Sequence, residues 1–203
     1  MEKYSVIYAS PPWLYNNVHV SYINQTGEIP SNNPAQEKIP LETILGLPVD
    51  KITCDDAVLF LWATTPILED AFKVMHAWGF SYKTLFTWEK TDARCLGYWF
   101  KTCTEHLIVA AKGNVKAFGS KARNCYHARK LRHGRKPDYF YQLIEKVTSG
   151  KRLELFPLED RPGWDAWNGD QAFVDSFLSN AEVALPEENN TLLSQETEII
   201  QAL

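Results

Sequence analysis

Apolar and polar positions follow two different periods along this chain. Continuous or near-continuous apolar runs predict five strands, at residues 4–9, 57–63, 82–88, 106–111 and 152–156. Apolar side chains that recur every three or four residues predict helices at residues 41–45, from Thr65 to Gly79 and from Lys136 to Gly150. Strands that alternate with helices predict an α/β fold, with a mostly parallel central sheet, right-handed crossovers and helices on both faces.

The starts and ends of these elements carry conformational information. Thr65 is predicted to cap its helix with Pro66 at the first position, and Gly79 to end it. Residues 14–38 are polar and predict a long loop. We predict one domain over residues 1–179 and an acidic, weakly ordered tail over residues 180–203.

The composition bounds the class of protein. With 203 residues, 45% of them apolar, the chain can form the core of one domain. The four cysteines lack a Cys-x-x-Cys pair, so we expect free, buried thiols and no metal site. No apolar run approaches the roughly 18 residues of a membrane span, and no signal peptide is recognisable, so we expect a cytoplasmic protein.

Charge is distributed unevenly. The net charge of −4 argues against a generic nucleic-acid binder, yet residues 112–136 carry nine Lys or Arg and no acid. This basic segment includes Arg123 and Arg129 and is interleaved with Phe118, Tyr126 and His127. Such a segment is typical of a surface that faces phosphates. The alternative is a solvated loop that happens to be basic.

The tetrapeptide Ser10-Pro11-Pro12-Trp13 directly follows the first predicted strand. Each proline removes an N–H and holds the preceding residue extended, so we expect the carbonyls of Ser10 and Pro11 to stay free. With the Ser10 hydroxyl they could accept hydrogen bonds from an amino group, while Trp13 offers a face for stacking. A planar base that carries an exocyclic amine fits both demands, and ligands of α/β sheets bind where strands end.

A second candidate loop follows the last predicted strand. With Trp164, Trp167, Asn168 and Arg161 it could hold a nucleoside-like cofactor, in which the tryptophans stack on a ring and Asn168 binds ribose hydroxyls. Lys136 stands at a predicted helix start, where it could pair with a carboxylate or a phosphate. The chain lacks the glycine-rich motifs that bind dinucleotides or ATP, so a cofactor with a carboxylate and no phosphate suits it better.

Seven segments in a fixed order resemble the MT-A70 family of S-adenosylmethionine-dependent adenine-N6 methyltransferases, particularly its short bacterial and phage members. They are Tyr4–Trp13, Asp56–Trp62, Gly97–Trp99, Glu105–Leu107, Arg135–Asp138, Leu153–Phe156 and Arg161–Trp167. The resemblance implies a Rossmann-like methyltransferase fold and S-adenosyl-L-methionine as cofactor. It also implies DNA or RNA as the substrate.

The resemblance also assigns roles to residues of this chain. It implies a catalytic loop of Ser10, Pro11, Pro12 and Trp13. The cofactor residues that it implies are Lys136, Phe156, Arg161, Trp164 and Asn168. The candidate substrate contacts are Tyr15, Asn16, Tyr98, Trp99, Glu105, Arg123 and Arg129.

The chain departs from the family pattern at its catalytic motif. The family has Asp where this chain has Ser10, and an uncharged hydroxyl is a weaker acceptor than a carboxylate. Three hypotheses follow: an active adenine enzyme that uses Ser, a shift to cytosine N4, or a catalytically impaired copy. The family's Glu after Lys-Pro-Asp is replaced by Tyr139, and its closing Gly-Asn motif by Asn168-Gly169-Asp170.

Two functions outside nucleic-acid methylation also stay open. One is a non-catalytic nucleic-acid-binding module on a methyltransferase scaffold, and the other is a small-molecule methyltransferase. A homo-oligomer or a partner subunit could complete the substrate groove. All enzymatic hypotheses require the turn at Ser10 and the stretch 156–168 to face a shared cavity.

Overall fold

The computed structural model describes residues 2–14, 38–92, 95 and 99–182. In this part of the chain seven strands form one sheet: β1 (Tyr4–Ala9), β2 (Thr53–Thr64), β3 (Ser81–Lys90), β4 (Thr104–Lys112), β5 (Cys125–Ala128), β6 (Arg152–Leu155) and β7 (Asp165–Trp167). The α-helices are α1 (Leu41–Leu45), α2 (Val49–Ile52), α3 (Leu68–Ala77), α4 (Asp138–Val147) and α5 (Gln171–Glu182). Two 3₁₀ turns, Thr65–Ile67 and Arg132–Gly134, precede α3 and α4.

The strand order of the sheet is β5-β3-β4-β2-β1-β6-β7. β4 pairs antiparallel with β2 and β3, and the other four pairings are parallel. β3 connects to β4 without a helix, so β4 runs back alongside β3, as in any hairpin. The sheet is therefore mixed and mostly parallel, which confirms the predicted α/β fold class.

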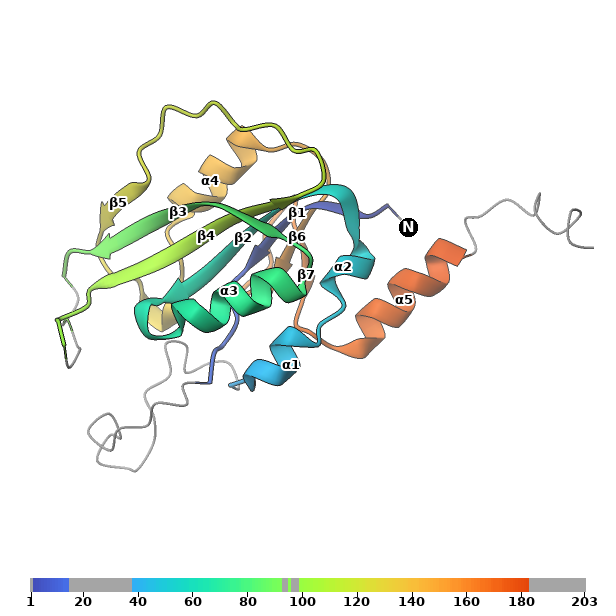
Figure 1. The fold of residues 1–203 in the computed structure, drawn as a ribbon, viewed down its shortest axis with the longest axis horizontal. Coiled ribbons are helices and arrows are strands. Elements are labelled where there is room, and N and C mark those ends of the chain that lie inside the picture. Colours follow the sequence, from blue (N-terminus) through green and yellow to red (C-terminus); the bar gives the residue numbers. More distant parts are fainter. Residues whose placement is uncertain (1, 15–37, 93–94, 96–98, 183–203) are drawn as a thin grey trace, which may run out of the picture.

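Helices cover both faces of the sheet (Figure 1). Ile7 and Ala9 of β1 point to the face packed by α1, α2, α3 and α5. Val6 and Tyr8, the alternate residues, point to the face packed by α4. Because both faces are buried, β1 has no polar side, which explains its nearly continuous apolar sequence.

β1 lies in the sheet between β2 and β6, and both neighbours run parallel to it. Ala9, its last residue, is level with Leu61 of β2 and Leu155 of β6. The Ser10 N–H then donates to the Leu155 carbonyl at 3.3 Å. The loops that leave β1 and β6 therefore begin side by side at the carboxyl edge of the sheet, where α/β proteins bind ligands.

The structure corrects the predicted cap of α3. β2 continues through Thr64 and a 3₁₀ turn intervenes, so Thr65 makes no side-chain capping bond. Its hydroxyl instead lies 3.2 Å from His106 Nε2 on β4. β5 and β7 were not predicted, because four and three residues are too few to show a strand period.

The expectation of free, buried thiols is wrong for Cys95 and Cys103, whereas Cys54 and Cys125 are free but not buried. Cys95 and Cys103 form a disulfide between Cα atoms 4.7 Å apart, because the chain reverses between β3 and β4 and brings them together. Cys54 is half-buried and Cys125 is exposed.

Two predicted segments extend beyond the described residues. Of the predicted loop over residues 14–38, residues 15–37 lie outside the described residues. Of the predicted tail, residues 183–203 lie outside them. Before that point α5 runs through Glu182. Among the described helices, none is both long enough and apolar enough to span a bilayer.

Candidate active site

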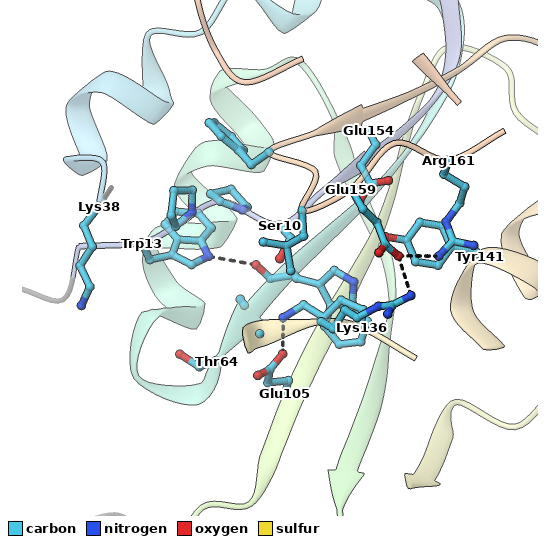
Figure 2. A pocket seen from close by; sticks show the side chains of 18 residues that line it. Ser10, Trp13, Lys38, Thr64, Glu105, Lys136, Tyr141, Glu154, Glu159 and Arg161 are labelled. Carbon is cyan, nitrogen blue, oxygen red and sulfur yellow. Dashed lines mark hydrogen bonds and ion pairs between the residues drawn. The ribbon is translucent and has the colours of Figure 1, made fainter. Parts of the chain in front are cut away.

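A pocket opens where the loops after β1 and β6 meet the start of α4 (Figure 2). The first loop contributes Ser10, Pro11, Pro12 and Trp13, and the second contributes Phe156, Leu158, Glu159 and Arg161. Arg135 and Lys136 come from the segment before α4, and Glu105 from β4. Other lining residues include Lys38, Trp62, Thr64, Tyr141 and Glu154. The two loops thus share one cavity, as the enzymatic hypotheses require.

The Ser10 loop is held by its own backbone and by one indole. The Trp13 N–H donates to the Pro11 carbonyl at 2.9 Å, so the expectation that this carbonyl is left free is wrong. The Trp13 indole Nε1 donates to the Trp62 carbonyl at 3.0 Å, and Trp13 is 7% exposed. Among the described residues, the Ser10 hydroxyl and carbonyl have no hydrogen-bond partner. Ser10 therefore presents to the pocket a hydroxyl and a carbonyl that no other described residue engages.

Phe156 turns the chain at the opposite wall. It has a φ of 61°, in the left-handed region that side chains other than glycine rarely adopt. Its N–H donates to the Trp167 carbonyl at 2.8 Å, and its ring is 3% exposed. The backbone conformation and the packed ring redirect the chain from β6 into the loop that carries Leu158, Glu159 and Arg161.

Glu105 joins two lysines, Lys90 and Lys136, in a buried cluster at the pocket, and Figure 2 shows its contact with Lys136. One carboxylate oxygen pairs with Lys90, and the other pairs with Lys136 Nζ at 2.6 Å. Glu105 is 4% exposed. Burial by itself would raise its pKa, but the charges and hydrogen bonds of Lys136 and Lys90 outweigh burial and lower the pKa to about 2. Glu105 is therefore ionised at neutral pH.

A second buried carboxyl, Glu154, ends a chain of hydrogen bonds beneath the pocket. The Trp62 indole donates to the Tyr8 hydroxyl at 2.7 Å, and the Tyr141 hydroxyl donates to Glu154 Oε1 at 2.6 Å. Tyr8 and Tyr141 rings lie 4.7 Å apart, centroid to centroid. Burial raises the pKa of Glu154 to about 7, although the bond from Tyr141 and the charge of Arg161 act to lower it. Glu154 thus exchanges a proton close to neutral pH.

Ion pairs connect the rim of the pocket to the start of α4. Arg135 pairs with Glu159 at 2.5 Å, and Arg161 pairs with Asp138 at 2.8 Å. The Arg161 guanidinium also lies 3.7 Å from the centroid of the Tyr141 ring. These contacts hold the loop after β6 against α4, so Arg161 reaches the pocket from above Tyr141.

Several residues assigned by the resemblance lie away from this pocket. Trp164 is 8% exposed and packs against Tyr8 and Tyr141 in the core under α4. Asn168 is exposed and does not line the pocket. Trp99 is 94% exposed between β3 and β4. Arg123 and Arg129 are exposed on either side of β5, and Tyr15, Asn16 and Tyr98 lie outside the described residues.

Sequence reasoning missed several residues of this region, among them Glu154, Tyr141 and Lys90, and also the lining residues Lys38, Trp62, Thr64, Arg135, Leu158 and Glu159. Glu154 had a detectable signal, because it is a lone acid inside the apolar run Leu153–Phe156. A charged residue at a strand position that must be buried requires a partner or a function. Tyr141 and Lys90 carry no such signal, since a tyrosine on a helix and a lysine at a strand end are common.

A mostly parallel α/β sheet with a pocket at the carboxyl ends of adjacent central strands is consistent with a Rossmann-like methyltransferase fold. The family model described as MT-A70 matches residues 4–171. The Type II methyltransferase M.MunI of Mycoplasma sp is 32% identical over 184 residues, which cover 82% of this chain and 77% of that protein. The N(6)-adenosine-methyltransferase MT-A70-like of Arabidopsis thaliana is 26% identical over 198 residues, 91% of this chain and 27% of that protein.

The chain belongs to the MT-A70 family. This confirms the family, the methyltransferase class and the cofactor, S-adenosyl-L-methionine, that the sequence resemblance implied. The chain spans most of the bacterial relative but about a quarter of the plant one.

The raised pKa of Glu154 predicts a specific dependence of stability on pH. Between about pH 4.5 and 7 the folded protein holds a proton on Glu154 that the unfolded chain releases, so folding loses stability as pH rises through this window. Glu154→Gln keeps an oxygen for Tyr141 but does not titrate. We expect its stability relative to wild type to rise by up to about 3 kcal/mol across that window in urea unfolding.

The control for this measurement is Glu69→Gln, the same substitution at a carboxyl that is 87% exposed on α3. Its stability relative to wild type should not reproduce the rise. A stability difference for Glu154→Gln that stays constant from pH 4.5 to 8 would contradict the assignment of a protonated, buried Glu154.

Proposed function

We propose that this protein transfers a methyl group from S-adenosylmethionine to the N6 amino group of adenine in DNA or RNA. The observation that carries the proposal is the shared pocket of Ser10, Lys136 and the loop after β6. The relatives support the chemistry, since one is named as a Type II methyltransferase and another as an N(6)-adenosine-methyltransferase. We place the reaction in the cytoplasm.

The residues of the pocket fit the cofactor's functional groups. The Glu105 cluster holds two ammonium groups and one carboxylate, so it carries a net positive charge that suits the cofactor's carboxylate. Glu154 and Glu159 are acceptors that suit its ammonium and hydroxyl groups, and Phe156 supplies an apolar wall. When bound, S-adenosylmethionine supplies a methyl group made electrophilic by its sulfonium.

In this proposal Ser10 orients the acceptor. Its hydroxyl and carbonyl would accept the two hydrogens of an exocyclic amine and aim the nitrogen lone pair away from the ring. The same bonds would stabilise the positive charge that develops on that nitrogen. Trp13 and Pro12 would hold the plane of the base. An adenine within a duplex would have to leave the stack to reach this pocket.

The basic segment supplies the proposed contacts to phosphate. Residues 112–136 contain β5, an edge strand of the described sheet, with Arg123 and Arg129 exposed beside it. We extend the proposal to a second copy or a partner subunit that completes the substrate groove. Trp99 and Phe100, which are 94% and 86% exposed between β3 and β4, are where such a subunit would contact this chain.

Lys136→Ala should weaken binding of S-adenosylmethionine by more than tenfold, because Glu105 would then lose one of its two cations and the cofactor's carboxylate would lose its partner. Isothermal titration calorimetry measures the change. Lys121→Ala, at an exposed lysine of the basic segment, is the control and should bind as wild type. Wild-type protein that gives no binding heat would contradict the proposed function.

Ser10→Asp should raise adenine methylation, because a charged acceptor binds the amine and stabilises its developing charge better than a hydroxyl. Transfer of labelled methyl groups to DNA and RNA, followed by mass spectrometry of the nucleosides, measures the rate and identifies the base. Ser10→Asn supplies an amide oxygen as acceptor without a negative charge. It therefore separates the effect of a different acceptor from the effect of the charge. Unchanged or lower activity of Ser10→Asp would contradict the role of Ser10.

The same assay distinguishes the alternatives that Ser10 raises. Methylcytosine as the product would shift the assignment to N4 of cytosine. A wild-type protein that binds nucleic acid and cofactor but gains activity only as Ser10→Asp would be a catalytically impaired member of the family.

Arg123→Ala combined with Arg129→Ala should weaken oligonucleotide binding and lower the slope of log affinity against log salt by about 2. Each phosphate contact releases counterions, so fewer contacts make binding less sensitive to salt. Lys73→Ala is the control, since Lys73 lies on α3, on the opposite face of the sheet, and pairs with Asp70. An unchanged slope would show that the basic segment does not face phosphates.

A further inference from the structure

Lys90 stands at the end of β3, just outside the pocket. Its Nζ pairs with Glu105, and its backbone N–H donates to the Cys103 carbonyl at 2.9 Å. The side chain is 14% exposed and its ammonium lies 5.1 Å from the centroid of the buried Trp88 ring. Lys90 does not line the pocket, whereas Glu105 and Lys136 do. Lys90 therefore does not touch a ligand in this pocket, and its ion pair with Glu105 is its link to the pocket lining.

The second lysine, Lys90, changes the net charge of this cluster. A buried Lys136–Glu105 pair alone would be neutral, and an entering carboxylate would meet both an ammonium and a competing carboxylate. With Lys90 the cluster holds two positive charges and one negative charge. Lys90 then compensates Glu105, and the charge of Lys136 is available to a second anion. In surroundings this buried, such a difference in net charge has large consequences for affinity.

We propose that Lys90 is a positioning residue that binds Glu105 and thereby keeps Lys136 available for the carboxylate of the cofactor. This inference rests on the proposed function for the cofactor pocket and adds to it a residue that does not touch the ligand. Glu105, which the resemblance suggested as a substrate contact, acts here as the link between the two lysines. The planar carboxylate presents one oxygen to each ammonium, so its orientation fixes where Lys136 lies.

The test compares two ligands that differ by one carboxylate, S-adenosylmethionine and decarboxylated S-adenosylmethionine, in calorimetry without nucleic acid. Lys90→Met keeps most of the side chain's length and its contact with Trp88 but removes the charge. We expect it to weaken binding of S-adenosylmethionine by about tenfold or more and to leave the decarboxylated ligand within about twofold of wild type. Lys83→Met, an exposed lysine of the same strand, is the control.

Two further variants separate charge from folding. Lys90→Arg keeps the cation and should retain most of the affinity for S-adenosylmethionine. Lys90→Met combined with Glu105→Gln removes one positive and one negative charge of the cluster, frees Lys136 from a competing carboxylate and should restore the affinity for S-adenosylmethionine to near that of wild type. The double variant leaves no unpaired buried carboxylate, so it keeps the test decisive if Lys90→Met alone does not fold.

Equal weakening for both ligands, no weakening for either, or no recovery in the double variant would overturn the role of Lys90 while leaving the proposed function in place. Wild-type protein that binds neither ligand would overturn the proposed function together with this inference.

Discussion

The parallel pairing of β1 with both β2 and β6 is the constraint on which the rest of this structure depends. It brings Ala9 level with Leu61 and Leu155, and it lets the Ser10 N–H bond directly to the Leu155 carbonyl. Two loops separated by about 145 residues therefore start from neighbouring points of one edge. In the proposed reaction, the methyl donor at one loop and the acceptor at the other can meet because these strands are adjacent.

The two buried carboxyls of this region are stabilised in opposite ways. Glu105 has two ammonium partners, and its pKa falls to about 2, so it is a fixed negative charge. Glu154 has a tyrosine hydroxyl and a more distant arginine, and burial raises its pKa to about 7. The difference comes from the number and distance of cations, because both side chains are about equally buried. One carboxyl organises cations, and the other changes its charge close to neutral pH.

Ser10 sets this chain apart from the family pattern without disturbing the architecture around it. The Trp13 indole holds the loop by donating a hydrogen bond to the Trp62 carbonyl, and this contact does not involve the Ser10 side chain. Position 10 can therefore change from an acid to a hydroxyl at little cost to folding. In the proposed function, the change at position 10 alters how strongly the pocket binds and polarises an amine, because the charge of the acceptor differs while the shape of the loop does not.

The strands at 4–9, 57–63, 82–88, 106–111 and 152–156, and the helices near them, followed from the apolar pattern, because burial on two faces leaves a continuous apolar run. The sequence also indicated that the Ser10 motif follows a strand, that Lys136 precedes a helix, and that the chain resembles the MT-A70 family. Tertiary structure alone decided that β4 runs antiparallel, that Cys95 meets Cys103, that Trp164 lies in the core, and that Glu105 joins Lys90 to Lys136. Strand neighbours and charge partners come from distant parts of the chain, so local periodicity holds no record of which of them meet.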